Sequence, residues 1–116
     1  MSRSVLLRLN DIVRAIDGAI ATTAAVDFET FRSTYYIVRT AERSIEIVSE
    51  ATRHIPDHLK ANYPDIPWRE IAGIGNILRH DYDRVDDRIL WEIVTVHFAA
   101  LRPVIIRIRA ELSGTD

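Results

Sequence analysis

The chain has 116 residues, the size of one ordinary domain, and we expect a single domain over residues 1–116. Hydrophobic residues make up 47% and charged residues 28%, which is typical of globular proteins and excludes an intrinsically disordered chain. The absence of cysteine excludes disulfides, thiolate metal sites and thiol nucleophiles, and the net charge of −2 means that nucleic-acid binding would need a local basic patch or a groove between subunits.

The first predicted element is an amphipathic helix over residues 4–23. Its apolar residues recur every three or four positions, as on one helical face: Val5, Leu9, Ile12, Ile16 and Ile20. Arg8, Asn10 and Asp11 interrupt this segment, unlike the core of a signal peptide, and no apolar run approaches the roughly 20 residues that span a bilayer. We therefore expect a cytoplasmic protein.

A short helix and a long helix are predicted next. Asp27 can cap a helical turn over residues 28–32, because its side chain can accept hydrogen bonds from the amides that follow it. Residues 34–54 form the long helix, with the apolar stripe Val38, Ala41, Ile45, Val48, Thr52 and Ile55. Pro56 ends it, and Arg39 and Arg43 each have a glutamate three or four positions away, as in surface ion pairs.

A helix that starts at Pro67 and runs to about His80 is the fourth predicted element. Before it, residues 57–61 form one helical turn and residues 63–67 form a loop, because each proline restricts the residue before it and lacks an amide donor. Proline suits a first helical position. The apolar face of this helix consists of Trp68, Ile71, Ile74 and Leu78.

The last predicted helix begins at a cap, Asp86 or Asp87, and continues to the C-terminus. Its apolar residues keep a spacing of three and four: Trp91, Val94, Phe98, Leu101, Ile105, Ile108 and Leu112. Pro103 removes one backbone hydrogen bond, so we expect a kink or a break near Ala99 and Ala100. No segment alternates with period two, and the fold class that follows is all-α, an antiparallel bundle of about five helices.

The helix after Pro67 carries the residues best suited to chemistry. At about 100° per residue, Arg69, Gly73, Asn76 and His80 share a narrow polar sector opposite the apolar face, with Arg79 at its edge. Histidine can transfer protons near neutral pH, and arginine can bind two phosphate oxygens. Together they suit cleavage of a phosphodiester in RNA, where histidine takes the proton of the 2′-hydroxyl and arginine stabilises the charge on phosphorus-bound oxygens. Solvated or helix-capping roles are the alternative.

Other histidines and acidic residues are weaker candidates. His54 and His58 have the spacing of two metal ligands, but Pro56 lies between them and no pair of carboxylates completes a site, so we expect no metal there. His97 is expected in the core or at an interface. The aspartates at positions 81, 83, 86 and 87 are expected to act as caps and solvated charges rather than as a cation site.

The stretch from about Arg53 to Val94, centred on IPWREIAGIGNILRHDYDRVDDRILWEIV, resembles the HepT-like toxins of the HEPN superfamily. The pattern of that family is an arginine, usually followed by asparagine, then a histidine after four to six intervening residues, and in the HepT branch a tyrosine two residues beyond the histidine. Asn76, His80 and Tyr82 match this pattern. The position immediately before Asn76, where the arginine should lie, is occupied by Gly75.

The resemblance implies a homodimeric, metal-independent endoribonuclease of a toxin-antitoxin module, with no cofactor and with the motif residues of two protomers meeting in a cleft. It implies His80, Asn76 and a neighbouring arginine as catalytic residues. Position 75 points about 140° away from His80 in an ideal helix, whereas Arg79 is about 100° away and Arg69 is nearly aligned with it. Arg79, and Arg69 as a further phosphate-binding residue, are therefore the candidates to replace the missing arginine.

The resemblance also implies a partner, a minimal nucleotidyltransferase antitoxin that transfers AMP to the motif tyrosine, which here is Tyr82. On sequence alone, Tyr82 could instead be a half-buried residue that closes the bundle. Two other interpretations stay open. The Gly75 variant could be a catalytically degenerate helical dimer that still binds the nucleotidyltransferase and is modified by it, or the chain could be a helical scaffold unrelated to RNA.

Overall fold

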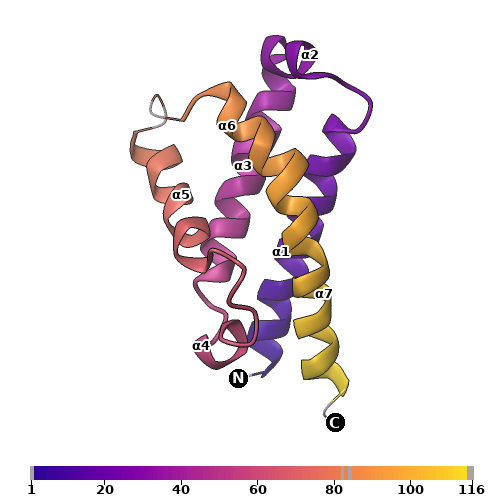
Figure 1. The fold of residues 1–116 in the computed structure, drawn as a ribbon, viewed down its shortest axis with the longest axis vertical. Coiled ribbons are helices and arrows are strands. Elements are labelled where there is room, and N and C mark those ends of the chain that lie inside the picture. The colour runs from indigo at the N-terminus through magenta and orange to yellow at the C-terminus, as the bar shows by residue number, and fades with distance from the viewer. Residues whose placement is uncertain (1, 82, 84, 115–116) are drawn as a thin grey trace.

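The computed structural model describes residues 2–81, 83 and 85–114, and in this part of the chain the regular structure is helical, without strands. The predicted all-α class is confirmed (Figure 1). The elements are α1 (Ser2–Thr23), α2 (Phe28–Ser33), α3 (Tyr35–Thr52), α4 (Asp57–Lys60), α5 (Trp68–His80), α6 (Asp87–Glu92), the π-helical turn η2 (Ile93–His97) and α7 (Phe98–Gly114).

Local signals set most of these boundaries, which agree with the predicted ones to within two residues. The Asp27 carboxylate accepts a hydrogen bond of 2.9 Å from the Thr30 amide at the start of α2. At the start of α6 it is Asp86, rather than Asp87, that caps, with a 2.9 Å bond from the Ile89 amide. Such caps satisfy amides that have no partner within the helix.

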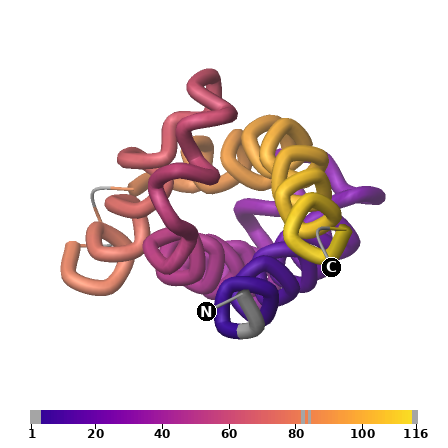
Figure 2. Tube along the Cα trace, turned by 90° about the horizontal axis from the view of Figure 1, so that it is seen from below, coloured from indigo at the N-terminus to yellow at the C-terminus, as the bar shows by residue number. Residues whose placement is uncertain are grey.

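The core lies between α1, α3 and the α6–α7 segment, where α1 packs against α3 on one side and against α7 on the other (Figures 1 and 2). The apolar stripes predicted from the sequence meet there. The most completely buried large side chains are Leu9, Ile12, Ile16, Phe31, Ile45, Val48, Leu90, Val94, Ile105 and Ile108. Each such side chain contributes about 1.5–3 kcal/mol to folding.

Helix α5 lies on the outer side of α3, as the view along the bundle shows (Figure 2). Two hydrogen-bonding side chains fasten it, one from Ser49 in α3 and one from Arg53 directly after the end of α3. Ser49 Oγ donates to the Ala72 carbonyl at 2.9 Å, and Arg53 donates to the same oxygen from Nε and Nη2 at 3.1 and 2.7 Å. Because Arg53 lies opposite Ala72 and Ser49 opposite Gly75, α5 runs antiparallel to α3.

A break near Ala99 and Ala100, one of the two predicted consequences of Pro103, is not there, because the helix continues through both residues to Gly114 with Pro103 inside it. The irregularity lies one turn earlier, at η2, where the Phe98 amide donates to the Ile93 carbonyl five residues back. Leu90, Val94 and Phe98 are all buried and are spaced by four. In an α-helix, two residues four positions apart differ by about 40° around the helix axis, so a series with this spacing drifts off one face. The wider η2 turn reduces this rotation and keeps the three side chains on the buried face.

The stretch Asp87–Gly114 is long and apolar enough, by length and composition alone, to cross a membrane, and its most apolar 18-residue window has a mean hydropathy of 1.7. Charged residues such as Glu92 and Arg102 interrupt the stretch, so it contains no uninterrupted apolar run of about 20 residues. Core helices of globular proteins pass the same test. Here one face of the stretch is buried against the bundle, and the other leaves apolar side chains such as Ile89 and Val96 exposed.

Candidate functional site

The outward face of α5 carries the predicted site residues, as its helical periodicity requires. Asn76, Arg79 and His80 are exposed in the last turn and a half of the helix, while Leu78 is buried against the core. Gly73 lies on the same outward face, and a Cβ added there would meet nothing within 4 Å. The end of α5 is therefore open to an incoming molecule.

Arg79 is held by Asn76, one helical turn away. Its Nη2 donates a hydrogen bond of 2.6 Å to Asn76 Oδ1. This bond fixes one edge of the guanidinium and leaves its other N–H groups available, because a guanidinium has five donors. The structure thus brings together Asn76 and Arg79, with His80 adjacent to Arg79 in the chain.

His80 is the last residue of α5, and the Asp81 amide donates to the Ile77 carbonyl at 2.8 Å where the helix ends. Arg79 and His80 both lie in the last turn, where a cation interacts favourably with the C-terminal end of the helix dipole. This structural role is compatible with a chemical one, since both side chains are exposed.

Gly75, at the position expected to hold the motif arginine, is buried in the contact between α5 and α3. Its amide donates to Ser49 Oγ at 3.1 Å, and a Cβ built on it would lie 2.6 Å from Ser49 Oγ and 2.8 Å from Ser49 Cβ. Real Cβ atoms essentially never come closer than 3.0 Å to such neighbours. An arginine cannot occupy position 75 while Ser49 stays in place.

Arg69 does not belong to the same phosphate-binding cluster within one chain. It is exposed and nearly aligned with His80 around the helix axis, but eleven residues separate the two positions. At 1.5 Å of rise per residue they lie about 16 Å apart. Arg69 is therefore too far from His80 along the helix for the two side chains to hold one anion together within one chain.

A small charged groove of about 220 Å³ lies beside Arg79, between α1, α3 and α5. Charged side chains of both signs line it: Arg8, Asp11, Arg43, Glu46, Glu50 and Arg79. His54 Nε2 lies 3.1 Å from Glu50 Oε2, and this hydrogen bond, with weaker help from the charges of Arg53 and Arg79, lowers the pKa of Glu50. Arg79, which was predicted to lie at the edge of the polar face of α5, thus also faces α3.

A second, larger cavity of about 560 Å³ lies on the other side of α5, between it and the η2–α7 segment. Its walls are mainly apolar and include Ile71, Ile74, Ile93 and Leu101, with Glu70 at the rim. His97 lines this groove and is exposed, so it does not lie in the core, and its alternative placement at an interface stays a prediction. The four-residue spacing of Val94 and Phe98 turns His97 away from the core.

The remaining sequence candidates are separate from this site. Tyr82, the predicted AMP acceptor, lies outside the described residues. His54 is paired with Glu50, and His58 is exposed in α4. Within residues 2–81, 83 and 85–114, no three histidine or acidic side chains are grouped closely enough to hold a metal ion.

Comparison with known proteins assigns the chain to a family. The model of the family described as "Ribonuclease HepT-like" matches residues 12–108. The chain belongs to the HepT-like ribonuclease family. The resemblance seen in the GNILRHDY segment is thereby confirmed, and the match extends well beyond it, from α1 into α7.

Two curated relatives are archaeal. "Putative RNase MJ1380" of Methanocaldococcus jannaschii is 35% identical over 92 residues, which cover 79% of this chain and 84% of the relative. "Probable ribonuclease HepT" of Thermococcus cleftensis is 36% identical over 102 residues, which cover 88% of this chain and 93% of the relative. No solved structure matches the chain.

Proposed function

We propose that this HepT-like protein is a metal-independent endoribonuclease, the toxin of a toxin-antitoxin module, which cleaves RNA in a cleft between two copies. Its family and the ribonuclease names of its relatives support an action on RNA. The observation that carries the proposal for this chain is the 2.6 Å bond between Arg79 and Asn76, which holds an arginine beside His80 although position 75 has none.

In the proposed reaction His80 takes the proton of a 2′-hydroxyl, and the resulting oxygen attacks the adjacent phosphorus. Arg79 binds the non-bridging phosphate oxygens, whose charge grows in the transition state, and Asn76 fixes the guanidinium in position. The bond to the 5′-oxygen breaks, and that oxygen receives a proton. The products are a 2′,3′-cyclic phosphate and a 5′-hydroxyl, so no water or metal takes part in the bond-breaking step.

A homodimer would supply two groups that one copy lacks, a proton donor for the leaving oxygen and a further arginine for a neighbouring phosphate. The histidine of the second copy can protonate the leaving 5′-oxygen, and its Arg69 can approach a phosphate that the first copy does not reach. Two features support association through the α5 side of the molecule: Gly73 leaves room for a close approach, and the apolar groove beside α5 is uncovered within one chain.

The proposed partner is a minimal nucleotidyltransferase that transfers AMP to Tyr82 and so inactivates the toxin. The location of Tyr82 in the chain supports this part, since it follows His80 by two residues. A bulky, negatively charged adenylate there would compete with RNA phosphates for Arg79. Mass spectrometry of Tyr82 after incubation with a purified minimal nucleotidyltransferase and ATP tests it.

Cleavage of an end-labelled RNA by the purified protein in the presence of EDTA tests the ribonuclease proposal. We expect cleavage products that end in a cyclic phosphate, and loss of cleavage in His80→Ala. His58→Ala is the matched control, because His58 is exposed on α4, away from the end of α5. Absence of cleavage, or cleavage that survives His80→Ala unchanged, contradicts the proposal.

The second candidate is a catalytically degenerate dimer that only binds the nucleotidyltransferase and is modified by it. The closed contact between Gly75 and Ser49 favours this alternative, because it leaves no place for the motif arginine. It predicts that the protein does not cut RNA but still acquires AMP on Tyr82.

A further inference from the structure

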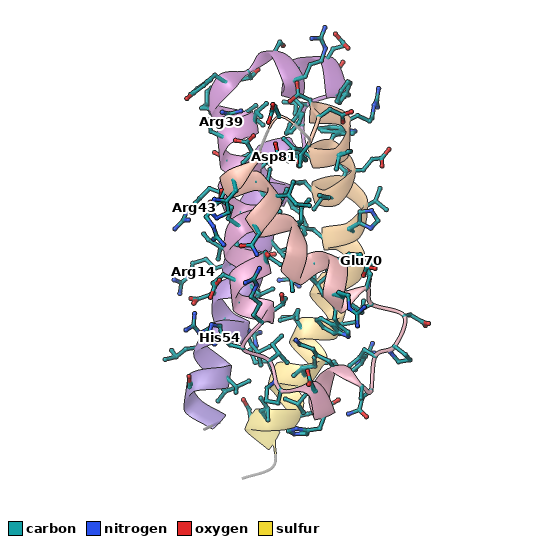
Figure 3. The ribbon with its side chains drawn as sticks, turned by 90° about the vertical axis from the view of Figure 1, so that its left-hand side faces the viewer. Arg14, Arg39, Arg43, His54, Glu70 and Asp81 are labelled. Carbon is teal, nitrogen blue, oxygen red and sulfur yellow. The ribbon has the colours of Figure 1, made fainter. Side chains whose placement is uncertain are left out.

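The outer edge of α3 forms an exposed ridge that runs from its N-terminus past the candidate site. Positions 36, 39, 43, 50 and 54 repeat at intervals that place them on one line along the helix, and all five side chains are exposed. We call Tyr36, Arg39, Arg43, Glu50 and His54, together with the neighbouring Tyr35, the α3 ridge. Figure 3 shows Arg39, Arg43 and His54 following one another along this edge.

Two tyrosines at the start of the ridge present their rings to solvent. Tyr35 is 75% exposed and Tyr36 is 69% exposed, more than any other large hydrophobic side chain in the described part of the chain. The guanidinium carbon of Arg39 lies 5.1 Å from the centre of the Tyr35 ring. Packing of the core therefore does not account for either ring, whereas tyrosine elsewhere in a protein usually buries its ring.

The arginines of the ridge are available to an anion. Arg39 is paired with Glu42 at 3.0 Å and Arg43 with Glu46 at 3.4 Å, but both arginines are on the surface. The side chains of Arg39 and Arg43 are 46% and 72% exposed, whereas those of Glu42 and Glu46 are 17% and 21% exposed. A phosphate can therefore bind the outward N–H groups of each guanidinium, which has five donors, while the glutamate keeps its bond. The ridge thus carries charges of both signs, and its arginines rather than a net positive charge would hold phosphates.

The ridge is continuous with the end of α5. Because α5 runs antiparallel to α3, with Ala72 opposite Arg53 and Gly75 opposite Ser49, the residues after Gly75 lie beside the middle of α3. Arg79 lines the same small groove as Arg43, and Arg8 of α1 lines its other side. A chain of phosphates that leaves Arg79 therefore meets Arg43 and then Arg39.

We infer that the α3 ridge binds a single-stranded segment of the RNA substrate, with phosphates on Arg43 and Arg39 and an unpaired base stacked on Tyr36. This inference rests on the proposed function for its ligand. Single-stranded RNA is held by aromatic platforms and by cations that follow its backbone, and the ridge offers both in one line. A duplex offers no free base faces to the tyrosines.

The test measures binding of a fluorescent RNA of about 12 nucleotides, with 2′-O-methyl groups that prevent cleavage, by fluorescence anisotropy. We expect Tyr36→Ala to raise the Kd about tenfold, as for the loss of one stacked base, and Tyr36→Phe to bind like the unaltered protein. Arg43→Gln should reduce the slope of log K against log salt concentration by about 0.7, the effect of one phosphate contact on a single strand.

Matched controls come from the α6–α7 side. Val96→Ala removes an exposed apolar side chain, and Arg107→Gln removes an exposed arginine that lies over Tyr63 rather than on the ridge. Neither should change the Kd or the salt slope. Circular dichroism of all variants checks that the helices are intact.

Three outcomes would overturn the inference, and they separate it from the proposed function. If the protein cuts RNA but the ridge variants bind the methylated RNA unchanged, the ridge is not the binding surface although the ribonuclease proposal stands. If Tyr36→Ala leaves RNA binding unchanged and lowers the mass of the assembly, the tyrosines cover a protein interface. If the protein neither binds nor cuts RNA, both proposals fail.

Discussion

Arg79 and Asn76 form the one side-chain pair in the described part of α5 that joins two candidate site residues by a hydrogen bond. In the proposed reaction Arg79 stabilises charge that is largest in the transition state. We expect Arg79→Gln to lower kcat by about 100-fold, as for removal of a donor from an oxyanion hole. Arg79→Lys should recover only part of the loss, because an ammonium group lacks the planar fork of a guanidinium and cannot donate to Asn76 Oδ1 while it binds two phosphate oxygens side by side.

The substitution Asn76→Ala tests the positioning of the Arg79 guanidinium separately from its charge. It leaves the cation of Arg79 in place and removes the 2.6 Å bond that orients it, so kcat should fall by less than in Arg79→Gln. Single-turnover cleavage kinetics of both variants measure the difference. An Asn76→Ala protein as inactive as Arg79→Gln would mean that Asn76 has a role of its own at the phosphate.

The contact between Gly75 and Ser49 gives a second prediction. Gly75→Ala should lower the free energy of unfolding by about 1–3 kcal/mol, because its Cβ would lie 2.6 Å from Ser49 Oγ. Adding Ser49→Gly removes the clash but also the Ser49 bonds to Ala72 and Gly75, so it should restore only part of the stability. Urea unfolding of the two single variants and the double variant gives the coupling between the positions, and strictly additive effects would show that they do not interact.

Sequence periodicity was sufficient to place Asn76, Arg79 and His80 on one exposed part of a helix. It could not show that position 75 faces Ser49, since these residues are 26 positions apart and neither has a distinctive pattern around it. The tyrosines of the α3 ridge were missed for a related reason. Exposure of a ring depends on what packs over it, and periodicity describes only the helix to which the ring belongs.

Among the elements, the positions of the helices followed from local signals, namely caps, prolines and apolar stripes with helical spacing. The position of the η2 turn did not follow from local signals, because a π-helical turn differs from an α-helical one by a single residue. We attribute the η2 turn to the joint burial of Leu90, Val94 and Phe98. Packing between α1 and the α6–α7 segment decides that burial. The proline rule predicted an irregularity in the right helix and placed it one turn too late.

An ion pair joins α1 to α7. Arg102 donates to both carboxylate oxygens of Asp17, at 2.6 and 3.1 Å, and this hydrogen bonding lowers the pKa of Asp17 below its usual value of 3.8. A lowered pKa in the folded state means that the pair stabilises the protein above that usual value, and that its contribution is lost as the pH falls through the folded-state value.

Asp17→Asn should therefore lower the free energy of unfolding at pH 7, by less than about 1 kcal/mol because the pair is exposed. The difference from the unaltered protein should disappear in acid, where Asp17 is protonated in both states. Thermal unfolding measured across this pH range checks the trend, with Asp11→Asn on the same helix as the control. A difference that grows as the pH falls would contradict the assignment.

For the molecule as a whole, two glycines with open surroundings make a matched pair. Gly18 on α1 and Gly73 on α5 would both accept a side chain without meeting any atom within 4 Å. Glutamine at either position should stabilise its helix by up to about 1 kcal/mol, because glycine is a poor helix former. Only Gly73 lies on the side where the proposed dimer forms.

Gly73→Gln should therefore weaken the dimer and reduce cleavage, while Gly18→Gln should leave both unchanged. Sedimentation of the unaltered protein should give a mass about twice the 13.3 kDa of the chain. The apolar groove of about 560 Å³ beside α5 would be covered in that dimer. A monomeric mass for the unaltered protein would exclude the cleft between two copies.

The contact between Ser49 and Gly75 also constrains how sequences of this kind can change. A lineage that carries this pair cannot gain an arginine at position 75 in one step, since the side chain would collide with α3 before it could reach a phosphate. Position 49 must first become glycine, and the hydrogen bond from Ser49 to Ala72 must be given up. Relatives with arginine at the equivalent position should therefore have a residue smaller than serine opposite it, a pairing that an alignment of the family would reveal.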